Sequence, residues 1–195
     1  MYLYGGLRLH QLLKISLFSH KTLKNGFTFI EVLVALFILV TGILGAVAMQ
    51  ASAKKGSFDA MQRSVASALA QDIIERMRSN DASVLADYAR SNYGEALNSV
   101  PTKRCNTLAQ LCNATEMSIN DQYEWEMSLM GADVVNDDKH LAGLVGAKAC
   151  INHNRNAVTV VISWQGREEI TDGKKHSCGT AGNKRRQLIV KAFIN

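Results

Sequence analysis

The chain has 195 residues, enough for one folded domain together with a targeting segment. Hydrophobic residues make up 47% of it and charged residues 20%, which excludes a disordered or collagen-like chain. The formal net charge is +5, but the first 26 residues hold no acid and four of the basic residues, Arg8, Lys14, Lys21 and Lys24. The remainder is therefore nearly neutral, which argues against a chain-wide electrostatic attraction to nucleic acid.

A long apolar segment comes next in the chain. Residues 27–49 read FTFIEVLVALFILVTGILGAVAM, and Glu31 is their only ionisable side chain. About 20 such residues span the hydrocarbon core of a bilayer. Lys21 and Lys24 precede the segment, so the positive-inside rule keeps the amino end cytoplasmic and places the carboxyl end outside. A plain signal anchor is the alternative, but a carboxylate is costly in lipid unless it has a partner, which favours a specific role for Glu31.

The residues around the start of this segment, KNGFTFIE at 24–31, resemble the recognition sequence of type IV prepilins. The resemblance implies that residues 1–26 are a cytoplasmic leader, which a prepilin peptidase removes by cutting after Gly26. It also implies that Phe27 becomes the N-methylated first residue of the mature chain. Glu31 is then expected to contact the amino terminus of a neighbouring subunit.

After the apolar segment, the hydrophobic pattern becomes that of an amphipathic helix over residues 50–79. Apolar residues recur at spacings of three and four, namely Phe58, Met61, Val65, Leu69, Ile73 and Met77. No proline interrupts residues 27–79, so we expect one helix of about 50 residues. Its first half lies in the membrane or the filament core, and its second half docks on an outer domain.

Residues 80–195 are expected to form this outer domain, a small antiparallel sheet with loops. Alternating polar and apolar residues predict a strand over 123–129, and branched residues predict strands over 157–164 and 187–194. A short helix is expected near 84–90, and turns near 136–139, 172–173 and 179–183. Together with the long helix, these elements predict an α+β protein with the pilin fold.

Four cysteines lie in the distal half of the chain: Cys105, Cys112, Cys150 and Cys178. An even number beyond an export segment favours disulfides in an oxidising compartment. Three pairings exist, and loop length favours Cys105 with Cys112 and Cys150 with Cys178. A zinc site formed by Cys150, His153, His176 and Cys178 is the less favoured alternative.

The sequence holds no recognisable catalytic motif, so we expect no enzyme activity, no catalytic residue, no cofactor and no resident metal. The basic run at 184–186, with Lys174 and Lys175 nearby, has the charge to meet phosphates. No aromatic residues interleave it as stacking platforms would require, so a solvated turn is the preferred interpretation and no nucleic acid is expected.

Further stretches extend the resemblance to the minor pilins of type IV pili: an Ala-rich helix ending in IIERMRSN, a late ISWQG strand and a terminal RRQLIV strand. Such a subunit is anchored in the bacterial inner membrane with a periplasmic carboxyl end, and later reaches the pilus tip at the cell surface. It joins other minor pilins and the major pilin, with the assembly machinery, to prime a pilus that supports adhesion or twitching motility. A minor pseudopilin of a type II secretion system and a DNA-uptake subunit are the alternatives.

Overall fold

The computed structural model describes residues 26–194, apart from Asn98, 109–110, Asp133, 137–138, 141–142 and 172–175. The chain divides into two units, residues 1–46 and 47–195, and the division falls inside helix α1 (Phe29–Ser79). The leader expected at 1–26 therefore lies outside the described residues except for Gly26. The turn expected at 172–173 and the middle of the turn expected at 136–139 also lie outside the described residues.

Helix α1 confirms the single helix expected from the absence of proline. Every residue from Gly26 to Ser57 is exposed, whereas the following part of α1 buries one side. The buried positions, Gln62, Ala66, Leu69, Ala70, Ile73, Ile74 and Met77, recur at helical spacing. Leu69, Ile73 and Met77 of the predicted stripe are buried, whereas Phe58 and Val65 are half-buried and Met61 is 54% exposed. The predicted stripe therefore coincides only in part with the face that packs into the outer domain.

Helix α2 (Ala114–Met130) replaces the strand expected over 123–129, and that prediction is wrong. The helix begins with a capping box, in which the Asn113 side chain accepts a bond from the Glu116 amide and the Glu116 side chain accepts one from the Asn113 amide. It ends at Gly131 in the left-handed conformation. The buried Ser118, Gln122, Trp125 and Leu129 follow the period of a helix, so the short polar–apolar alternation was a coincidence within it.

The short helix expected near 84–90 is confirmed as the 3-10 helix η1 (Ala82–Tyr88). Asp81 caps it by accepting a hydrogen bond from the Ser83 amide at 2.8 Å. A two-stranded ladder, β1 (Val135–Asn136) with β2 (Lys139–His140), follows α2.

The main sheet has the antiparallel order β3-β4-β5. Strands β4 (Ala157–Gln165) and β5 (Arg185–Phe193) confirm the two late strands that were expected. Strand β3 (Lys148–Asn154) was missed. Three consecutive residues, Ala149 to Ile151, are buried on both faces of the sheet, and this hides the alternation that would identify a strand.

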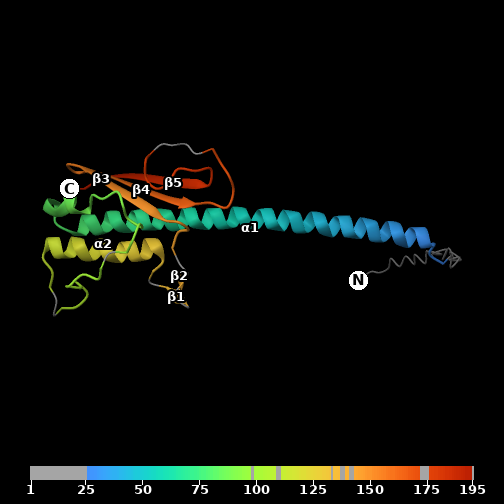
Figure 1. Ribbon diagram of the computed structural model, residues 1–195, viewed down its shortest axis with the longest axis horizontal. Helices are drawn as coiled ribbons and strands as arrows, with labels where there is room; N and C mark the ends of the chain where they lie inside the picture. The colour runs from blue at the N-terminus through green and yellow to red at the C-terminus, as the bar shows by residue number, and fades with distance from the viewer. Residues whose placement is uncertain are drawn as a thin grey trace, which may run out of the picture. The chain divides into compact units, whose positions relative to one another are not determined.

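Within residues 47–195, helix α1 lies between α2 on one side and the main sheet on the other (Figure 1). The core is formed by all three: Ala66, Leu69, Ala70, Ile73, Ile74 and Met77 of α1, Trp125 and Leu129 of α2, and Val158, Val160, Ile162 and Trp164 of β4. The Trp125 indole N–H donates to the Leu69 carbonyl at 2.8 Å, which fixes α2 against α1. The structure therefore has an apolar N-terminal helix packed on a three-stranded antiparallel sheet, an α+β pilin-like fold.

Candidate functional site: the assembly segment and its outer domain

The amino-terminal end of α1 holds Glu31 in a reciprocal hydrogen-bonded cap. The Glu31 carboxylate accepts from the Thr28 amide and from the Thr28 hydroxyl, both at 3.0 Å. The Glu31 amide donates to Thr28 Oγ1 at 3.3 Å. This is the geometry of a capping box, which satisfies amides that a helix start otherwise leaves unpaired. The carboxylate therefore lies at the first turn of the helix, beside the expected new amino terminus.

The surface around Glu31 is apolar and open. Phe27 is 86% exposed and Phe37 is 70% exposed. Phe27, Ile30, Val34 and Ile38 line one face of the segment together with Glu31 and Ala35. In length and composition α1 contains a stretch able to cross a membrane. So much exposed apolar area is stable only against lipid or against other apolar helices.

Gly26 and Phe27, the expected cleavage and methylation positions, precede the first turn of α1 and are both exposed. Apart from the chain neighbours of Gly26, no atom of the described residues lies within 4 Å of a Cβ added at this position. The described part of the chain therefore does not require glycine here. Any requirement for glycine must come from a partner that contacts the backbone closely.

Two disulfides close loops in the outer domain. Cys105 is bonded to Cys112 and Cys150 to Cys178, which is the pairing that loop length favoured. The second bond ties β3 to the segment before β5, and its sulfurs are covered by Val161 and Ile189 on the sheet face opposite α1. Because these two sulfurs bond to each other, they are not available as the thiolate ligands of the alternative zinc site.

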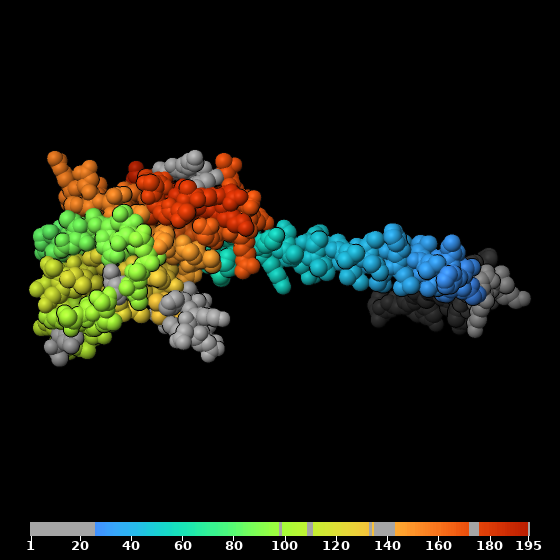
Figure 2. Space-filling model, viewed as in Figure 1, coloured from blue at the N-terminus to red at the C-terminus, as the bar shows by residue number. Residues whose placement is uncertain are grey.

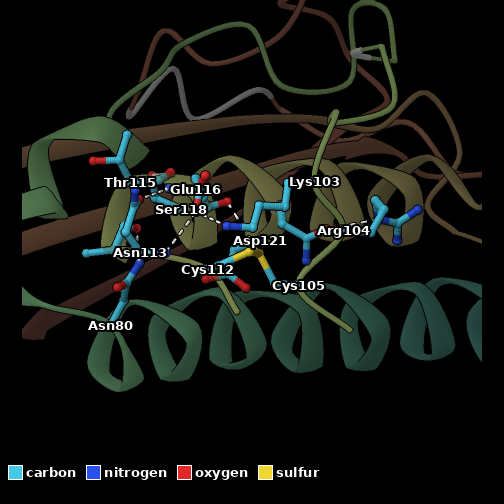
Figure 3. The surroundings of a disulfide bond; sticks show 12 residues. Asn80, Lys103, Arg104, Cys105, Cys112, Asn113, Thr115, Glu116, Ser118 and Asp121 are labelled. Carbon is cyan, nitrogen blue, oxygen red and sulfur yellow. Dashed lines mark hydrogen bonds and ion pairs between the residues drawn. A yellow bond between two sulfur atoms is a disulfide. The ribbon is translucent and has the colours of Figure 1, made fainter. Parts of the chain in front are cut away.

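The shorter loop is fixed to the start of α2 (Figure 3). The Lys103 ammonium forms an ion pair with the Glu116 carboxylate at 2.8 Å. The Lys103 hydrogen bond, together with the bond from the Asn113 amide, lowers the pKa of Glu116. The Cys105 sulfur lies 3.7 Å from the Glu116 carbonyl. The loop and the capping box of α2 therefore form one unit.

A charged network joins α1 to α2 beside the core. The Arg76 guanidinium contacts Asp72, Asp121 and Glu124, each at 3.1 Å, and Arg104 contacts Glu124 at 3.0 Å. Burial opposes ionisation of Glu124, but hydrogen bonds from Arg104 and Arg76 outweigh it and lower its pKa. Burial is also the main reason that the pKa of Tyr88, whose hydroxyl donates to Asp121, is raised.

Sequence reasoning missed this network. The pair Asp72 and Arg76 has the spacing of a helical ion pair and was a visible signal. Of its partners on α2, Glu124 was assigned to the strand expected over 123–129 and Asp121 lay before that strand, so nothing in the sequence placed the two acids on one helix face.

The basic run at 184–186 is largely engaged within the outer domain. Arg185 is 4% exposed, and its guanidinium donates to the carbonyls of His176 and Cys178 at 3.3 and 3.2 Å. Arg186 forms an ion pair with Asp59 of α1 at 3.1 Å. Lys174 and Lys175 lie outside the described residues. The two arginines therefore hold the sheet together rather than forming an open phosphate-binding cluster.

Comparison with protein families gives two matches along the chain. Residues 21–47 match the prokaryotic N-terminal methylation motif, and residues 48–123 match the model of the type IV pilin Tt1218. No curated protein and no solved structure matches the chain significantly. The first match covers the Glu31 segment, and the second covers the docked half of α1, η1 and the first turns of α2. The methylation motif, the apolar first helix and the pilin-like α+β fold together make the chain similar to type IV pilins, a family of structural subunits rather than enzymes, and they fit a precursor that is anchored in a membrane.

Proposed function

We propose that this pilin is a minor pilin of the PilV kind, which joins other minor pilins in a tip complex that primes pilus assembly and so supports adhesion or twitching motility. The observation that carries the proposal is the open apolar segment headed by the capped Glu31. A carboxylate in that setting serves assembly, because spanning a membrane does not require it.

The precursor lies in the inner membrane with its outer domain in the periplasm. Prepilin peptidase cuts after Gly26 and methylates the amine of Phe27. Within the membrane, Glu31 of one subunit then neutralises the amine of another, and the apolar faces pack together. Both charges are costly in lipid when they are alone, so the pairing favours one helical register over others.

The minor role is supported by the late part of the chain. Its resemblance to minor pilins includes the IIERMRSN end of α1, the ISWQG sequence of β4 and the RRQLIV sequence of β5. Helix α1 is also continuous over 51 residues, and the only proline of the chain, Pro101, lies beyond it. Many major pilins carry a proline in the apolar half of this helix.

Processing gives the first test. Gly26→Ala is expected to leave the precursor uncut without disturbing the fold, because the structure leaves room for the added methyl group. Mass spectrometry of the wild-type chain should find Phe27 at its amino terminus, N-methylated. The matched control is Ala46→Gly, a similarly small change in the exposed segment, which should be cut normally. A mature chain that begins beyond residue 49 would contradict the assignment.

Assembly gives the second test. A strain that lacks this protein should lose surface pili and twitching, and the wild-type gene should restore both. The mature chain should co-purify in detergent with the other minor pilins of the same genome. Loss of protein secretion with normal pili would instead identify a pseudopilin of a type II secretion system. Salt-sensitive DNA binding by the purified chain, with normal piliation, would favour the DNA-uptake alternative.

A further inference from the structure

The two edges of the main sheet differ in how their backbone groups are used. Antiparallel pairs alternate between hydrogen-bonded and non-bonded positions, so along an edge strand every second residue directs its N–H and C=O away from the sheet. The register and the bonds that flank the strands fix which residues these are. On β5, the Gly166 amide donates to the Lys184 carbonyl and the Ile194 amide to the Asn156 carbonyl, both at 2.8 Å.

The outward residues of β5 follow from that parity. Positions 184 and 194 are bonded toward β4, so Arg186, Leu188, Val190 and Ala192 are as well. Ile189, Lys191 and Phe193 direct their backbone groups to the free edge. Within the described part of the chain, these outward backbone groups have no hydrogen-bond partner.

The opposite edge, on β3, is closed by the chain itself. The Ala149 amide donates to the Tyr93 carbonyl at 3.0 Å, and the Ile151 amide to the Arg90 carbonyl at 2.7 Å. Tyr93 and Ala149 also form an isolated bridge. The Arg90 guanidinium lies 4.3 Å from the centre of the Tyr93 ring and holds this covering segment in place. Among the described residues, the chain thus covers the β3 edge of its sheet and places no strand beside the β5 edge.

The core beneath β5 is also incompletely covered. Leu188, Val190 and Ala192 face α1 and pack against the core, together with Val65 of α1, but all four are only partly buried. On the other face, Phe193 is 64% exposed. Strand β5 forms part of the red surface in Figure 2. A strand added at this edge would gain backbone hydrogen bonds and would cover apolar side chains on both faces.

The charges on the side chains of β5 favour one kind of partner strand. All ionisable side chains of β5 are cationic, and Arg185 and Arg186 are already engaged within the domain. Lys191 is exposed and is the cation left to meet a strand at the outward positions. A second copy of β5 would bring cations against cations, whereas a strand carrying Asp or Glu would pair favourably. A lysine on an edge also disfavours pairing with uncharged strands, so it makes the edge selective.

We propose that the open edge of β5 binds an extended, acid-containing strand of another pilin subunit, which adds a fourth strand to the main sheet. This inference rests on the proposed function, because it names the contact by which the outer domain joins the tip complex.

Lys191→Pro is the decisive variant. It removes one outward N–H without touching a bond to β4, and proline is tolerated at such edge positions. Lys191→Ala is the matched control, because it removes the same side chain and keeps the N–H. In detergent, with co-expressed minor pilins, we expect Lys191→Pro to lower recovery of the partner at least about tenfold, which corresponds to about 1.4 kcal/mol. Lys191→Ala should lower it less, and Lys191→Glu more than Lys191→Ala.

Amide hydrogen exchange measures the same contact without a substitution. In the isolated mature chain, the amides of Leu188, Val190 and Ala192 should exchange slowly and those of Ile189 and Lys191 rapidly. In the complex, the latter two should slow at least about tenfold.

The two failures are distinguishable. If the wild-type chain recovers no minor pilin, the proposed function fails. If it recovers them and Lys191→Pro recovers them equally, with unchanged exchange at Ile189 and Lys191, the edge is not the contact. Self-association that Lys191→Pro abolishes would show that the occupant is a second copy, which also overturns the proposal.

Discussion

The two halves of α1 belong to one continuous helix but satisfy different environments. Ile38 in the first half is 63% exposed, and Ile73 in the second half is fully buried. The first half has one acid, Glu31, whose hydrogen bonds stay within its own first turn. The second half has Arg76, which bonds to two acids of another helix. Both halves are helical, so the tendency of their residues to form a helix does not explain why one half is exposed and the other buried.

The difference lies in which partner each half requires. The docked half finds its partners inside the chain, so its contribution is measured by the stability of the outer domain. The exposed half buries none of its described side chains, so its apolar surface is left for lipid or other subunits. Substitutions of one kind in the two halves should therefore change different properties, stability in one and assembly in the other.

The largest effect is expected when the acid of the first half, Glu31, is replaced, and the same replacement of an acid in the second half serves as the control. Glu31→Val should insert in the membrane and be processed, because removing the acid makes the segment more apolar. It should nevertheless fail to co-purify with minor pilins and fail to restore surface pili, since the neighbour's amine loses its partner. Glu75→Val is the control: Glu75 contacts Arg78 on the protein surface and should assemble normally. Normal piliation by Glu31→Val would remove Glu31 from the assembly mechanism.

A matched pair of isoleucines gives the next effect. Ile73→Ala should lower the free energy of unfolding of the outer domain by about 2 to 5 kcal/mol, because it leaves a cavity in the core. Ile38→Ala makes the same change on the exposed face and should leave that free energy unaltered. Denaturant unfolding of the detergent-solubilised chain, followed by near-UV circular dichroism, measures both. Equal losses would mean that the first half also packs against the outer domain.

The sequence predicted the elements whose signal is local. The length of α1 follows from an uninterrupted helical pattern, and Val158, Val160 and Ile162 make β4 visible as a branched, apolar run. The start of α2 was missed although Asn113 and Glu116 carry its capping signature. Over the few residues from Tyr123, the apolar side chains fit both the alternation of a strand and the period of a helix. Only the packing of Trp125 against Leu69 of α1 decides for the helix.

The candidate site divides in the same way. Gly26, Phe27 and Glu31 could be predicted because they stand at fixed spacing in a local sequence that resembles the prepilin recognition sequence and lies within the matched methylation motif. The closed edge of β3 and the open edge of β5 depend on contacts between residues far apart in the chain, such as Tyr93 with Ala149. No local pattern carries that information, so the difference between the two edges emerges only from the folded chain.

The disulfides should change the stability of the outer domain, into which the second half of α1 packs, by intermediate amounts. Replacing Cys150 and Cys178 by serine opens a loop of 28 residues, whereas replacing Cys105 and Cys112 opens one of seven. Loop entropy gives losses of about 3.6 and about 2.4 kcal/mol, respectively. Unfolding of both double variants under the same conditions tests the order. A larger loss for the short loop would show that its contact with the start of α2 outweighs chain entropy.

The smallest effect tests the charged network that distinguishes the docked half. Arg104 and Arg76 lower the pKa of Glu124 against the opposing effect of burial, so the folded chain binds the proton of Glu124 less readily than the unfolded chain. The stabilisation is therefore complete above the unfolded pKa of about 4.3 and is lost as the pH falls through the lower folded value. Glu124→Gln should destabilise the outer domain at pH 7 by about 1 kcal/mol or less, because the network is partly exposed.

The difference between this variant and the wild type should shrink as the solution is acidified from pH 5 toward pH 2, since the wild-type carboxylate then becomes neutral as well. Glu75→Gln is the control, because it also removes one negative charge, here from an exposed ion pair with Arg78. Urea midpoints measured across this pH range would show the convergence. If the difference stayed constant with pH, Glu124 would act through packing rather than through its charge, and the contrast between the two halves of α1 would then rest on apolar burial alone.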